Sequence, residues 1–424
     1  MLQSVRGTYD IIGEEFQKFH YVNDLFEHFM KLYGYEMIKT PVIEDTAVFK
    51  KDNDTSDMVT KEMFTFSING KDSLTLRPEG TAGVIRAFIQ HKLYARELPV
   101  KLAYIEEMFR YERPQKGRQR QFNQLGIEVL GDKSPLIDAE VIALGYSFLK
   151  TLGIEDMEVH INTLGDSTSR LRYLEALKEY FRPHIDELCA DCKDRLEKNP
   201  LRILDCKIDH DKDVIKRAPS IYDHLEDEAK SYFKQVLSYL DALEIPYVID
   251  EHMVRGLDYY TDTVFEVVST DKDAGSQSTI FGGGRYDSLI EEMGGPKMSG
   301  IGFAIGEERL ISAMESAGLF DDLSITPDVY VIDLTSQDSF ALEVAEMLRH
   351  NGYATELNYY KRSLKSQFKS ADRKKTRFII IIGEDEVKER KVSLKDKKEE
   401  TQEMVKIEGL IAKLDVLMEG DRDE

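Results

Sequence analysis

Two stretches of the sequence combine charged, amide and aromatic residues in a way that indicates a binding pocket. Residues 109–131 read FRYERPQKGRQRQFNQLGIEVLG, so a cationic loop joins two apolar segments that carry polar side chains. Residues 254–266 read VRGLDYYTDTVFE and place an arginine, an aspartate and two tyrosines close together. Neither composition is typical of a hydrophobic core. We therefore expect these residues to line a pocket that binds a polyanion beside a small polar molecule.

The cations of the first stretch suit a nucleoside triphosphate. Guanidinium groups bind phosphate oxygens bidentately and stack on flat rings, and Phe122 supplies an aromatic face beside them. The sequence contains neither a GxxxxGK[ST] loop nor a GxGxxG motif, so side chains must hold the phosphates. Arg309 ends residues 300–309, whose glycine-rich pattern indicates a strand running into a helix. It is a further candidate cation, although such an arginine alone is most often a surface residue. The arginines of the loop are Arg110, Arg113, Arg118 and Arg120.

A second set of polar residues suits a small molecule. Gln124 and Glu128 are four positions apart on a predicted strand, so their side chains share one face of the sheet. A carboxylate that faces inward from a sheet indicates either a ligand or a structural ion pair, and the residues alone leave both readings open. The other members of this set are Glu79, Thr81, Tyr259 and Tyr260.

The elements that must position these residues follow from hydrophobic periodicity. Residues 14–33 are predicted to form an amphipathic helix, and residues 35–43 a strand that Pro41 interrupts. A helix over 81–93 follows, and then an antiparallel hairpin of strands 102–113 and 120–130. Residues 254–266 are expected to be one short extended segment.

The rest of the chain is expected to contain an insertion and a second domain. Residues 170–245 have charged helical patterns and contain all three cysteines, which predicts a helical insertion. Strands over 264–269 and 278–281 precede a helix from about 299 to 317. After a linker at 318–327, strands and helices alternate, which predicts a small α/β domain with a mostly parallel sheet. The final helix, which contains Leu410 and Leu414, should cover that sheet.

Composition limits the class of protein. The chain has 424 residues, of which 42% are hydrophobic, so we expect a globular protein of two or three domains. It has only three cysteines, no apolar run long enough to cross a bilayer, and no signal-peptide pattern at its start, so we expect a cytoplasmic protein.

The net charge of −22 argues against a surface that attracts nucleic acid everywhere. Two islands are positive instead. Residues 361–377 carry eight basic residues and one acid, and residues 110–120 carry five basic residues and one acid. These islands indicate directed contacts with phosphates. A solvated helix face is the alternative interpretation of the 361–377 island taken alone.

Six stretches, in order along the chain, resemble the histidyl-tRNA synthetase family. They are residues 6–10 (RGTYD), 75–82 (TLRPEGTA), 109–131, 254–266, 282–286 (GGGRY) and 300–310. Residues 35–44, 109–128 and 300–310 resemble motifs 1, 2 and 3 of the class II synthetases. Motif 2 by itself indicates only the class, whereas RGLDYY at 255–260 is specific to histidyl enzymes and their paralogues.

The resemblance covers essentially the whole chain and implies an α+β fold. Residues 1–322 would form a class II catalytic domain, with an antiparallel sheet flanked by helices and a helical insertion at about 170–245. Residues 327–424 would form an α/β anticodon-binding domain. The implied enzyme is a cytoplasmic homodimer that ligates L-histidine to tRNA(His) through a histidyl-adenylate, using ATP and the Mg²⁺ bound with it.

The resemblance also implies roles for individual residues. Histidine would be held by Glu79, Gly80, Thr81, Arg110, Gln124, Glu128, Arg255, Tyr259 and Tyr260, with Glu128 and Tyr260 reading the imidazole nitrogens. ATP would be held by Arg110, Glu112, Arg118, Phe122 and Arg309. Arg110, Arg255 and Arg309 would stabilise the reacting phosphates. Gln115 and Arg120 would contact the acceptor end of tRNA.

Two other proteins of related sequence are alternatives. A non-catalytic paralogue serves as the regulatory subunit of ATP phosphoribosyltransferase, but it typically lacks the C-terminal domain and loses motif residues. A domain that senses uncharged tRNA would normally lie within a longer kinase chain. Because this chain keeps Arg110, Arg255, Arg309 and the C-terminal pattern, the enzyme is favoured.

Two departures from the family pattern concern single groups. Glu307 stands where the family usually has an aliphatic residue, and we expect its side chain to point away from Arg309 because helix residues two apart do not share a face. Four residues have the side chains of zinc ligands and could form a zinc site, namely Cys189, Cys192, Cys206 and His210. Only the first pair has the usual spacing, and related synthetases carry such cysteines without metal, so we expect no structural metal.

Overall fold

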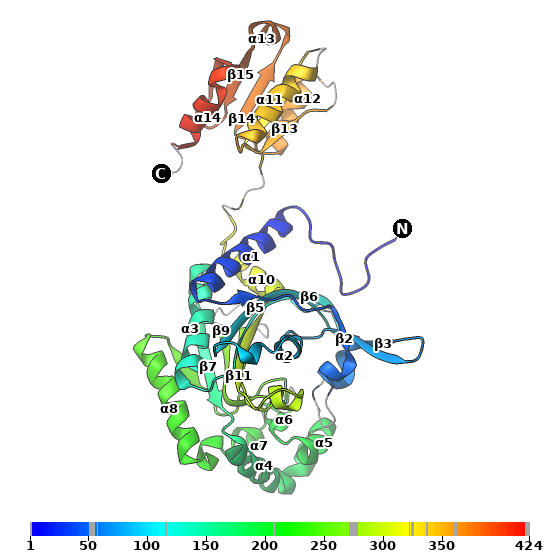
Figure 1. Cartoon of the computed structure of the whole chain (residues 1–424), viewed down its shortest axis with the longest axis vertical. Coiled ribbons are helices and arrows are strands. Elements are labelled where there is room, and N and C mark those ends of the chain that lie inside the picture. The colour runs from blue at the N-terminus through cyan, green and yellow to red at the C-terminus, as the bar shows by residue number, and fades with distance from the viewer. Residues whose placement is uncertain are drawn as a thin grey trace. The chain divides into compact units, whose positions relative to one another are not determined.

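The computed structural model describes residues 2–50, 56, 58–114, 117–206, 208–270, 279–321, 323, 326–335, 338–359 and 363–419. The chain divides into two compact units, Met1–Asp322 and Leu323–Glu424 (Figure 1). Each unit has its own sheet and its own hydrophobic core.

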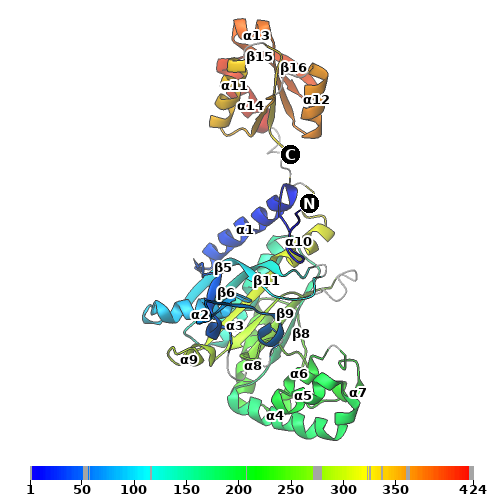
Figure 2. The same cartoon turned by 90° about the vertical axis from the view of Figure 1, so that its right-hand side faces the viewer.

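An eight-stranded sheet is the centre of the first unit (Figures 1 and 2). Its six middle strands pair with one another in antiparallel fashion, and only the pairings of the two outermost strands are parallel. The predicted α+β class with a large antiparallel sheet is therefore confirmed. The strands, in their order across the sheet, are β1 (Glu36–Met37), β5 (Val100–Phe109), β6 (Gln121–Leu130), β11 (Gly300–Gly306), β10 (Thr279–Tyr286), β9 (Thr261–Ser269), β7 (Met157–Thr163) and β8 (Tyr247–Ile249).

The predicted hairpin is present as β5 and β6, although β5 ends at Phe109 and the connection is longer than expected. Residues 300–306 form strand β11 and Glu307–Ser316 form helix α10, which confirms the strand running into a helix expected for 300–309. The helix predicted from about 299 is therefore wrong in its first half. The glycines at 282–284 lie inside β10 rather than after it. Pairing with a neighbour on each side holds β10 and β11 extended, and tertiary pairing of this kind outweighs local glycine signals.

Helices flank this sheet. Helix α1 (Glu14–Leu32) confirms the predicted amphipathic helix and buries Phe19, Val22, Phe26, Phe29 and Met30. Helices α2 (Thr81–Gln90) and α3 (Pro135–Thr151) follow. In the described part of the chain, no helix combines the length and the apolar composition that crossing a membrane requires.

The predicted strand over 35–43 is two short strands that belong to different sheets. Strand β1 joins the eight-stranded sheet, whereas β2 (Ile43–Asp45) joins a three-stranded sheet with β4 (Asp72–Leu76) and β3 (Phe64–Ile68). Pro41 lies between β1 and β2, where a missing N–H breaks no ladder.

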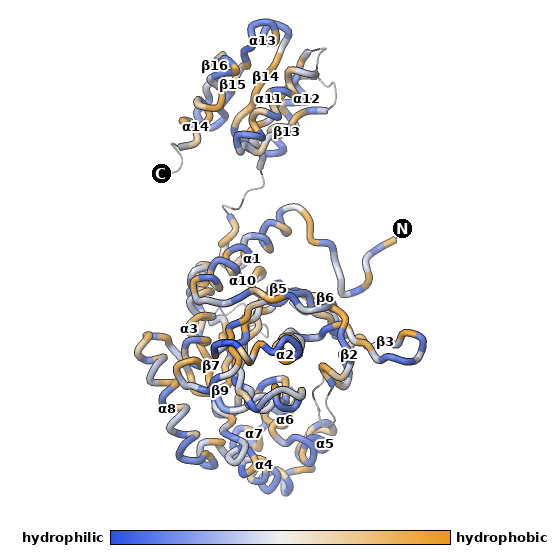
Figure 3. Tube along the Cα trace, in the orientation of Figure 1, coloured by the Kyte–Doolittle hydropathy of each residue, from blue (hydrophilic) through white to orange (hydrophobic). Residues whose placement is uncertain are grey.

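The region between β7 and β8 is helical. Its helices are α4 (Ser167–Phe181), α5 (Ala190–Lys198), α6 (Leu201–Leu204), α7 (Asp213–Lys216) and α8 (Asp227–Ala242). Helices α4 to α7 gather at one end of the unit around a core that includes Tyr173, Leu177 and Phe181 (Figure 2). Hydrophobic and hydrophilic residues alternate along α8 (Figure 3). This helix buries Ala229, Phe233, Val236 and Leu240 and lies beside α3.

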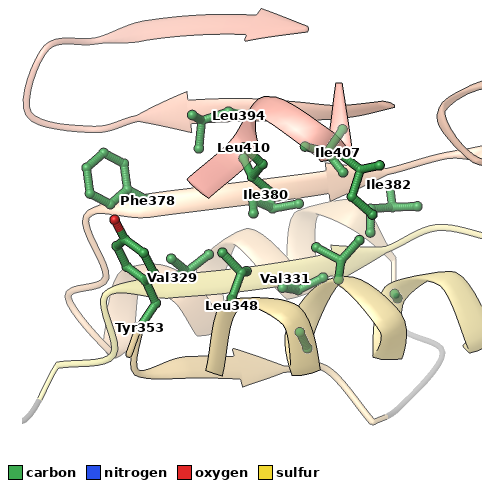
Figure 4. Close-up of a cluster of buried hydrophobic side chains, with 14 of the residues drawn as sticks. Val329, Val331, Leu348, Tyr353, Phe378, Ile380, Ile382, Leu394, Ile407 and Leu410 are labelled. Atoms are coloured by element: carbon green, nitrogen blue, oxygen red, sulfur yellow. The ribbon is translucent and has the colours of Figure 1, made fainter. Parts of the chain in front are cut away.

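The second unit is a five-stranded sheet with the order β13 (Thr355–Leu357), β12 (Val329–Asp333), β14 (Phe378–Ile382), β15 (Lys391–Asp396) and β16 (Thr401–Lys406). Val329, Val331 and Ile380 lie on one face with Leu348 and Leu410 (Figure 4). These last two residues belong to α11 (Asp338–His350) and α14 (Leu410–Glu419).

The opposite face of that sheet carries α12 (Leu364–Arg373), whose Ala371 packs with Tyr330 and Ile379. The short helix α13 (Glu384–Glu389) leads into β15. The predicted sheet is wrong in one respect, since β15 and β16 extend it in antiparallel fashion. Strand β16 is mostly exposed, so its sequence lacks the apolar run of a buried strand.

Candidate active site

A cavity of about 700 Å³ lies in the first unit, over strands β6, β10 and β11. The connection between β5 and β6, the loop at 254–260 and the insertion complete its walls. It brings together thirteen residues that the sequence singled out, namely Glu79, Gly80, Thr81, Arg110, Glu112, Arg118, Phe122, Gln124, Glu128, Arg255, Tyr259, Tyr260 and Arg309.

Glu128 is the most deeply placed acid of the cavity. Its side chain comes from β6 and is 1% exposed. The Thr81 hydroxyl donates to Oε1 at 2.7 Å, and the Tyr286 hydroxyl donates to Oε2. Burial raises the pKa of Glu128 to about 8, although these two hydrogen bonds oppose the shift. Near neutral pH the group can therefore offer either a proton or an acceptor to a ligand.

A glycine on the neighbouring strand makes room for this carboxylate. Gly302 of β11 is paired with Glu128, and a Cβ at Gly302 would lie 2.2 Å from Glu128 Oε2. Any larger residue would therefore displace the acid from the cavity floor.

Glu79 caps the helix that supplies Thr81. Its carboxylate accepts from the backbone N–H groups of Thr81 at 2.7 Å and Ala82 at 2.8 Å. Burial raises the pKa of Glu79. The hydrogen bonds from the two N–H groups and the charge of Arg110 oppose this shift without reversing it. The carboxylate lines the cavity and retains lone pairs for a ligand cation.

Three tyrosines form an aromatic wall around Glu128. The ring centroids of Tyr259 and Tyr260 are 4.8 Å apart, and Tyr259 meets Tyr286 edge-on at 5.7 Å. The buried Gln124 Oε1 has no hydrogen-bond partner among the described residues. A buried acceptor that lacks a protein partner and lines a cavity is available to a ligand donor.

The other part of the cavity is cationic. The Arg110 guanidinium lies 5.3 Å from the Phe122 ring centroid, and its Nε donates to Pro78 O at 2.8 Å. Arg118 is 3.2 Å from Glu112. Arg309 Nε donates to Gly117 O at 3.2 Å. Burial and the nearby Arg118 lower the pKa of Arg309, so these cations lie close enough to repel and would gain from a shared anion.

Arg255 enters the cavity from a loop. Residues 254–260 precede β9 and are not the extended segment that the sequence predicted. The guanidinium pairs with Glu266, while its buried Nε has no hydrogen-bond partner in the described part of the chain. Gly282 leaves space for it, because a Cβ there would lie 2.6 Å from an Arg255 nitrogen.

Side chains of the insertion hold the loop at 254–260. The local sequence did not predict these contacts. Arg170 of α4 donates to Tyr260 O at 2.7 Å and to Asp258 O at 3.1 Å. Asn199 donates to the Asp258 carboxylate at 2.9 Å, and Arg202 donates to Arg255 O at 2.9 Å. Basic residues on charged helices resemble a solvated face, so nothing in their local pattern indicated this role.

Arg120 is a further candidate, and it does not line the cavity. Arg120 stacks on Tyr111, with its guanidinium 3.9 Å from the ring centroid, and Gln115 lies outside the described residues. Glu307 is 1% exposed and does not line the cavity, whereas Glu308 and Arg309 do. The expectation that Glu307 points away from Arg309 is confirmed.

Comparison with known proteins identifies relatives of the whole chain. Residues 7–310 match the family model described as histidyl-tRNA synthetase, and residues 328–417 match an anticodon binding domain. A histidine–tRNA ligase of Listeria innocua is 49% identical over 416 residues, which cover 97% of this chain and 98% of that protein.

Solved structures give the same result. Apo histidyl-tRNA synthetase of Staphylococcus aureus matches with a TM-score of 0.83 at 38% identity, covering 97% of this chain and 99% of that chain. A Bacillus halodurans protein described as an ATP phosphoribosyltransferase regulatory subunit/histidyl-tRNA synthetase matches with a TM-score of 0.63. It is 24% identical and covers 90% of this chain and 98% of its own, which shows a shared fold alone.

Proposed function

Since the chain belongs to the histidyl-tRNA synthetase family, we propose that its cavity activates L-histidine with ATP and passes it to tRNA(His). The chain is a class II aminoacyl-tRNA synthetase that charges tRNA with histidine, as its full-length relatives are histidine–tRNA ligases. The family uses ATP. One observation carries the proposal for the site: a buried acid with tyrosines and a group of arginines line the same cavity.

The acidic part of the cavity would bind histidine. Glu128 and Tyr260 would read the two imidazole nitrogens, since a buried carboxylate and a phenol accept and donate hydrogen bonds to such a ring. Tyr259 would line the pocket. The ammonium and carboxylate groups of histidine would be held by Glu79, Gly80, Thr81 and Gln124, with Arg110 and Arg255 near the carboxylate. The partnerless Oε1 of Gln124 supports this arrangement.

The cationic part would bind ATP. Phe122 would stack on adenine, and Glu112 would lie on the adenine side. Arg118 would also lie in the ATP site. Arg110 would contact the α-phosphate and Arg309 the γ-phosphate, because bidentate guanidinium groups match phosphate oxygens. The mutual repulsion of Arg309 and Arg118 in the protein supports a polyanionic ligand between them.

Two reaction steps follow. A histidine carboxylate oxygen bonds to the α-phosphorus, the bond to the bridging oxygen breaks, and pyrophosphate leaves with the electron pair. Because the carboxylate is already a nucleophile, no side chain acts as base. Arg110 and Arg255 stabilise the charge that grows on the non-bridging oxygens. The terminal ribose hydroxyl of tRNA then attacks the adenylate carbonyl, and AMP leaves.

Magnesium would enter with ATP. It takes oxygen ligands, commonly one or two carboxylates and substrate phosphates. The carboxylate of Glu308 lines the cavity and fits this requirement. Burial raises the pKa of Glu308 to about 7, and a nearby cation would favour its ionised form. When bound, the ion neutralises charge on the outer phosphates.

The second unit would contact tRNA. We assign residues 1–322 to catalysis and residues 327–424 to the anticodon stem. Lys361 and Arg362 of the basic island lie outside the described residues, and Arg377 pairs with Asp396 at 3.0 Å. The phosphate contacts are assigned to the cations of the island at 361–377, which include Lys365 and Lys369. Gln115 and Arg120 would contact the acceptor end.

We also propose a homodimer in the cytoplasm, where tRNA and ATP are found. In class II folds, the region of motif 1 forms a two-fold interface, and isologous dimers are the commonest symmetric assembly. Here that region comprises α1 and residues 35–44. Sedimentation should give about twice the chain mass of 48.8 kDa. An active monomer at assay concentration would contradict the proposal.

The regulatory alternative is less supported, because the full-length relatives are ligases and the anticodon-domain match is present. Histidine-dependent exchange of pyrophosphate into ATP tests the first step, and charging of tRNA(His) tests the second. The expected result is exchange that requires histidine and is not supported by glutamine. Binding of histidine without exchange or charging would favour the regulatory alternative.

A further inference from the structure

Three cysteines of the insertion converge although they come from different elements. Cys189 precedes α5 and Cys192 lies in its first turn, whereas Cys206 follows α6. Cys192 and Cys206 are 0% and 3% exposed. The sulfur atoms of Cys189 and Cys206 lie 3.7 Å apart. One carboxylate oxygen of Asp209 and the three sulfur atoms all lie within 4.8 Å of one another.

The thiolate is the form of cysteine that binds a metal ion. Three sulfur atoms that lie within 4.8 Å of one another, two of them on buried residues, therefore suit a metal that prefers sulfur ligands.

Asp209 is an unusual residue for the core of a small helical region. It is 0% exposed, its Oδ2 accepts from the Cys189 N–H at 2.8 Å, and its Oδ1 is 2.8 Å from Lys212 Nζ. Hydrogen bonds of this kind orient a carboxylate ligand and leave lone pairs for a metal ion. Three thiols and one carboxylate thus form a complete set of four donors.

We propose that Cys189, Cys192, Cys206 and Asp209 bind one zinc ion in a closed, tetrahedral structural site. Thiolates select soft or borderline metals, and structural zinc sites are four-coordinate. Two sulfur atoms on a zinc ion with bonds of about 2.3 Å lie roughly 3.8 Å apart, which matches the separation of Cys189 and Cys206. The expectation of no structural metal is revised accordingly.

The fourth ligand differs from the one that sequence spacing offered. His210 is largely exposed, is 3.1 Å from Asp211, and does not belong to the cluster of ligand atoms. The chain turn after Cys206 directs Asp209 inward instead. A ligand three positions after Cys206 repeats the spacing between Cys189 and Cys192.

Such an ion would brace one wall of the active-site cavity. It would join the start of α5 to the segment after α6, and Arg195, Arg202, Asp205 and Cys206 of these parts line the cavity. Arg202 in turn holds the backbone of Arg255. The role is therefore structural, because the four donors leave no open position for substrate.

Metal analysis of the full-length chain tests the site without relying on activity. Protein purified without chelator, or unfolded and refolded with Zn²⁺, should hold about one zinc per chain after gel filtration. Refolding with Co²⁺ instead should give the intense visible bands and sulfur-to-metal charge transfer of a tetrahedral thiolate site. In the denatured apo-protein, three thiols per chain should react with a thiol reagent, because the sequence has three cysteines.

Variants locate the ligands. Loss of a group that only supports a ligand typically lowers metal affinity by about 10- to 100-fold. Cys192→Ser removes a ligand itself, so it should lower zinc affinity by more than this. Asp209→Asn should shift the cobalt spectrum, because its fourth ligand changes. His210→Ala is the matched control and should keep both the zinc content and the spectrum.

Two results would overturn the site. One is a refolded wild-type chain that takes up well under one zinc and gives no tetrahedral cobalt spectrum. The other is a Cys189–Cys206 disulfide in the purified protein together with no zinc uptake after reduction. An unchanged spectrum in Asp209→Asn with a changed one in His210→Ala would overturn the assignment of the fourth ligand. Because wild-type spectra decide the main question, unfolding of a variant does not obscure it.

Discussion

Arg255 combines two properties that suit a group acting on a transition state. Its ion pair with Glu266 fixes its position, while its unpartnered Nε leaves a donor for a ligand. Replacement by alanine should lower histidine-dependent pyrophosphate exchange by at least about 100-fold, the usual scale for one preorganised charge. Arg96→Ala is the matched control, since Arg96 forms an exposed pair with Glu36. Near-normal exchange in a folded Arg255→Ala protein would remove the proposed role.

Glu128 gives a prediction about stability and pH. Burial raises its pKa from an ordinary value of 4.5 to about 8, so between these values the folded state keeps a proton that the unfolded state has lost. The free energy of unfolding must therefore fall as pH rises through this window. Glu128→Gln removes the titration, so its melting temperature relative to wild type should be higher at about pH 9 than at about pH 5.

The exposed Glu36 supplies the control for this measurement, because Glu36→Gln should show no such trend. The same Glu128→Gln variant should lose discrimination for the imidazole in the exchange assay. A difference in melting temperature that is constant across pH would mean that Glu128 is ionised in the folded protein throughout.

At the scale of elements, the insertion acts as a clamp on the loop at 254–260. Arg170→Ala removes the donors to Tyr260 O and Asp258 O, and each lost hydrogen bond of a charged donor weakens the loop. We expect kcat/KM for histidine to fall by about 10-fold or more, mainly through KM, because Arg170 positions the pocket without lining it. Steady-state exchange kinetics at varied histidine measure this split.

Arg172→Ala is the matched control for the clamp. Arg172 lies on the same helix, is half-exposed, and pairs with Glu226 rather than with the loop. Equal kinetics for the two variants would show that α4 does not position the pocket, whereas partial rescue by Arg170→Lys would support a charge-assisted contact.

At the scale of the whole molecule, the two units predict separable activities. Every cavity residue precedes Asp322, and the first unit has its own core. A chain ending at residue 322 should therefore keep histidine-dependent exchange, while charging of tRNA should fall steeply. The two chains should be compared at concentrations that give the same exchange rate. If they then charge tRNA equally, residues 327–424 serve another purpose.

The family, the large antiparallel sheet and most residues of the cavity were predictable from the residues alone. Motifs carry this information because the chemistry of a phosphate or an imidazole requires particular side chains, such as Arg110 or Glu128, at fixed places on paired strands. Helix α1 and the helices of the second unit were also predictable, because amphipathic periodicity records which side of a helix is buried.

Contacts between groups that are distant in the sequence depend on the folded arrangement. The local pattern of residues 300–306 allowed both a strand and the start of a helix, and pairing on both sides makes them strand β11. Arg170 and Asn199 hold the loop at 254–260 from another part of the chain, and Asp209 rather than His210 faces the three cysteines. Such contacts depend on how helices pack in three dimensions, and a local pattern records burial but not the identity of the partner.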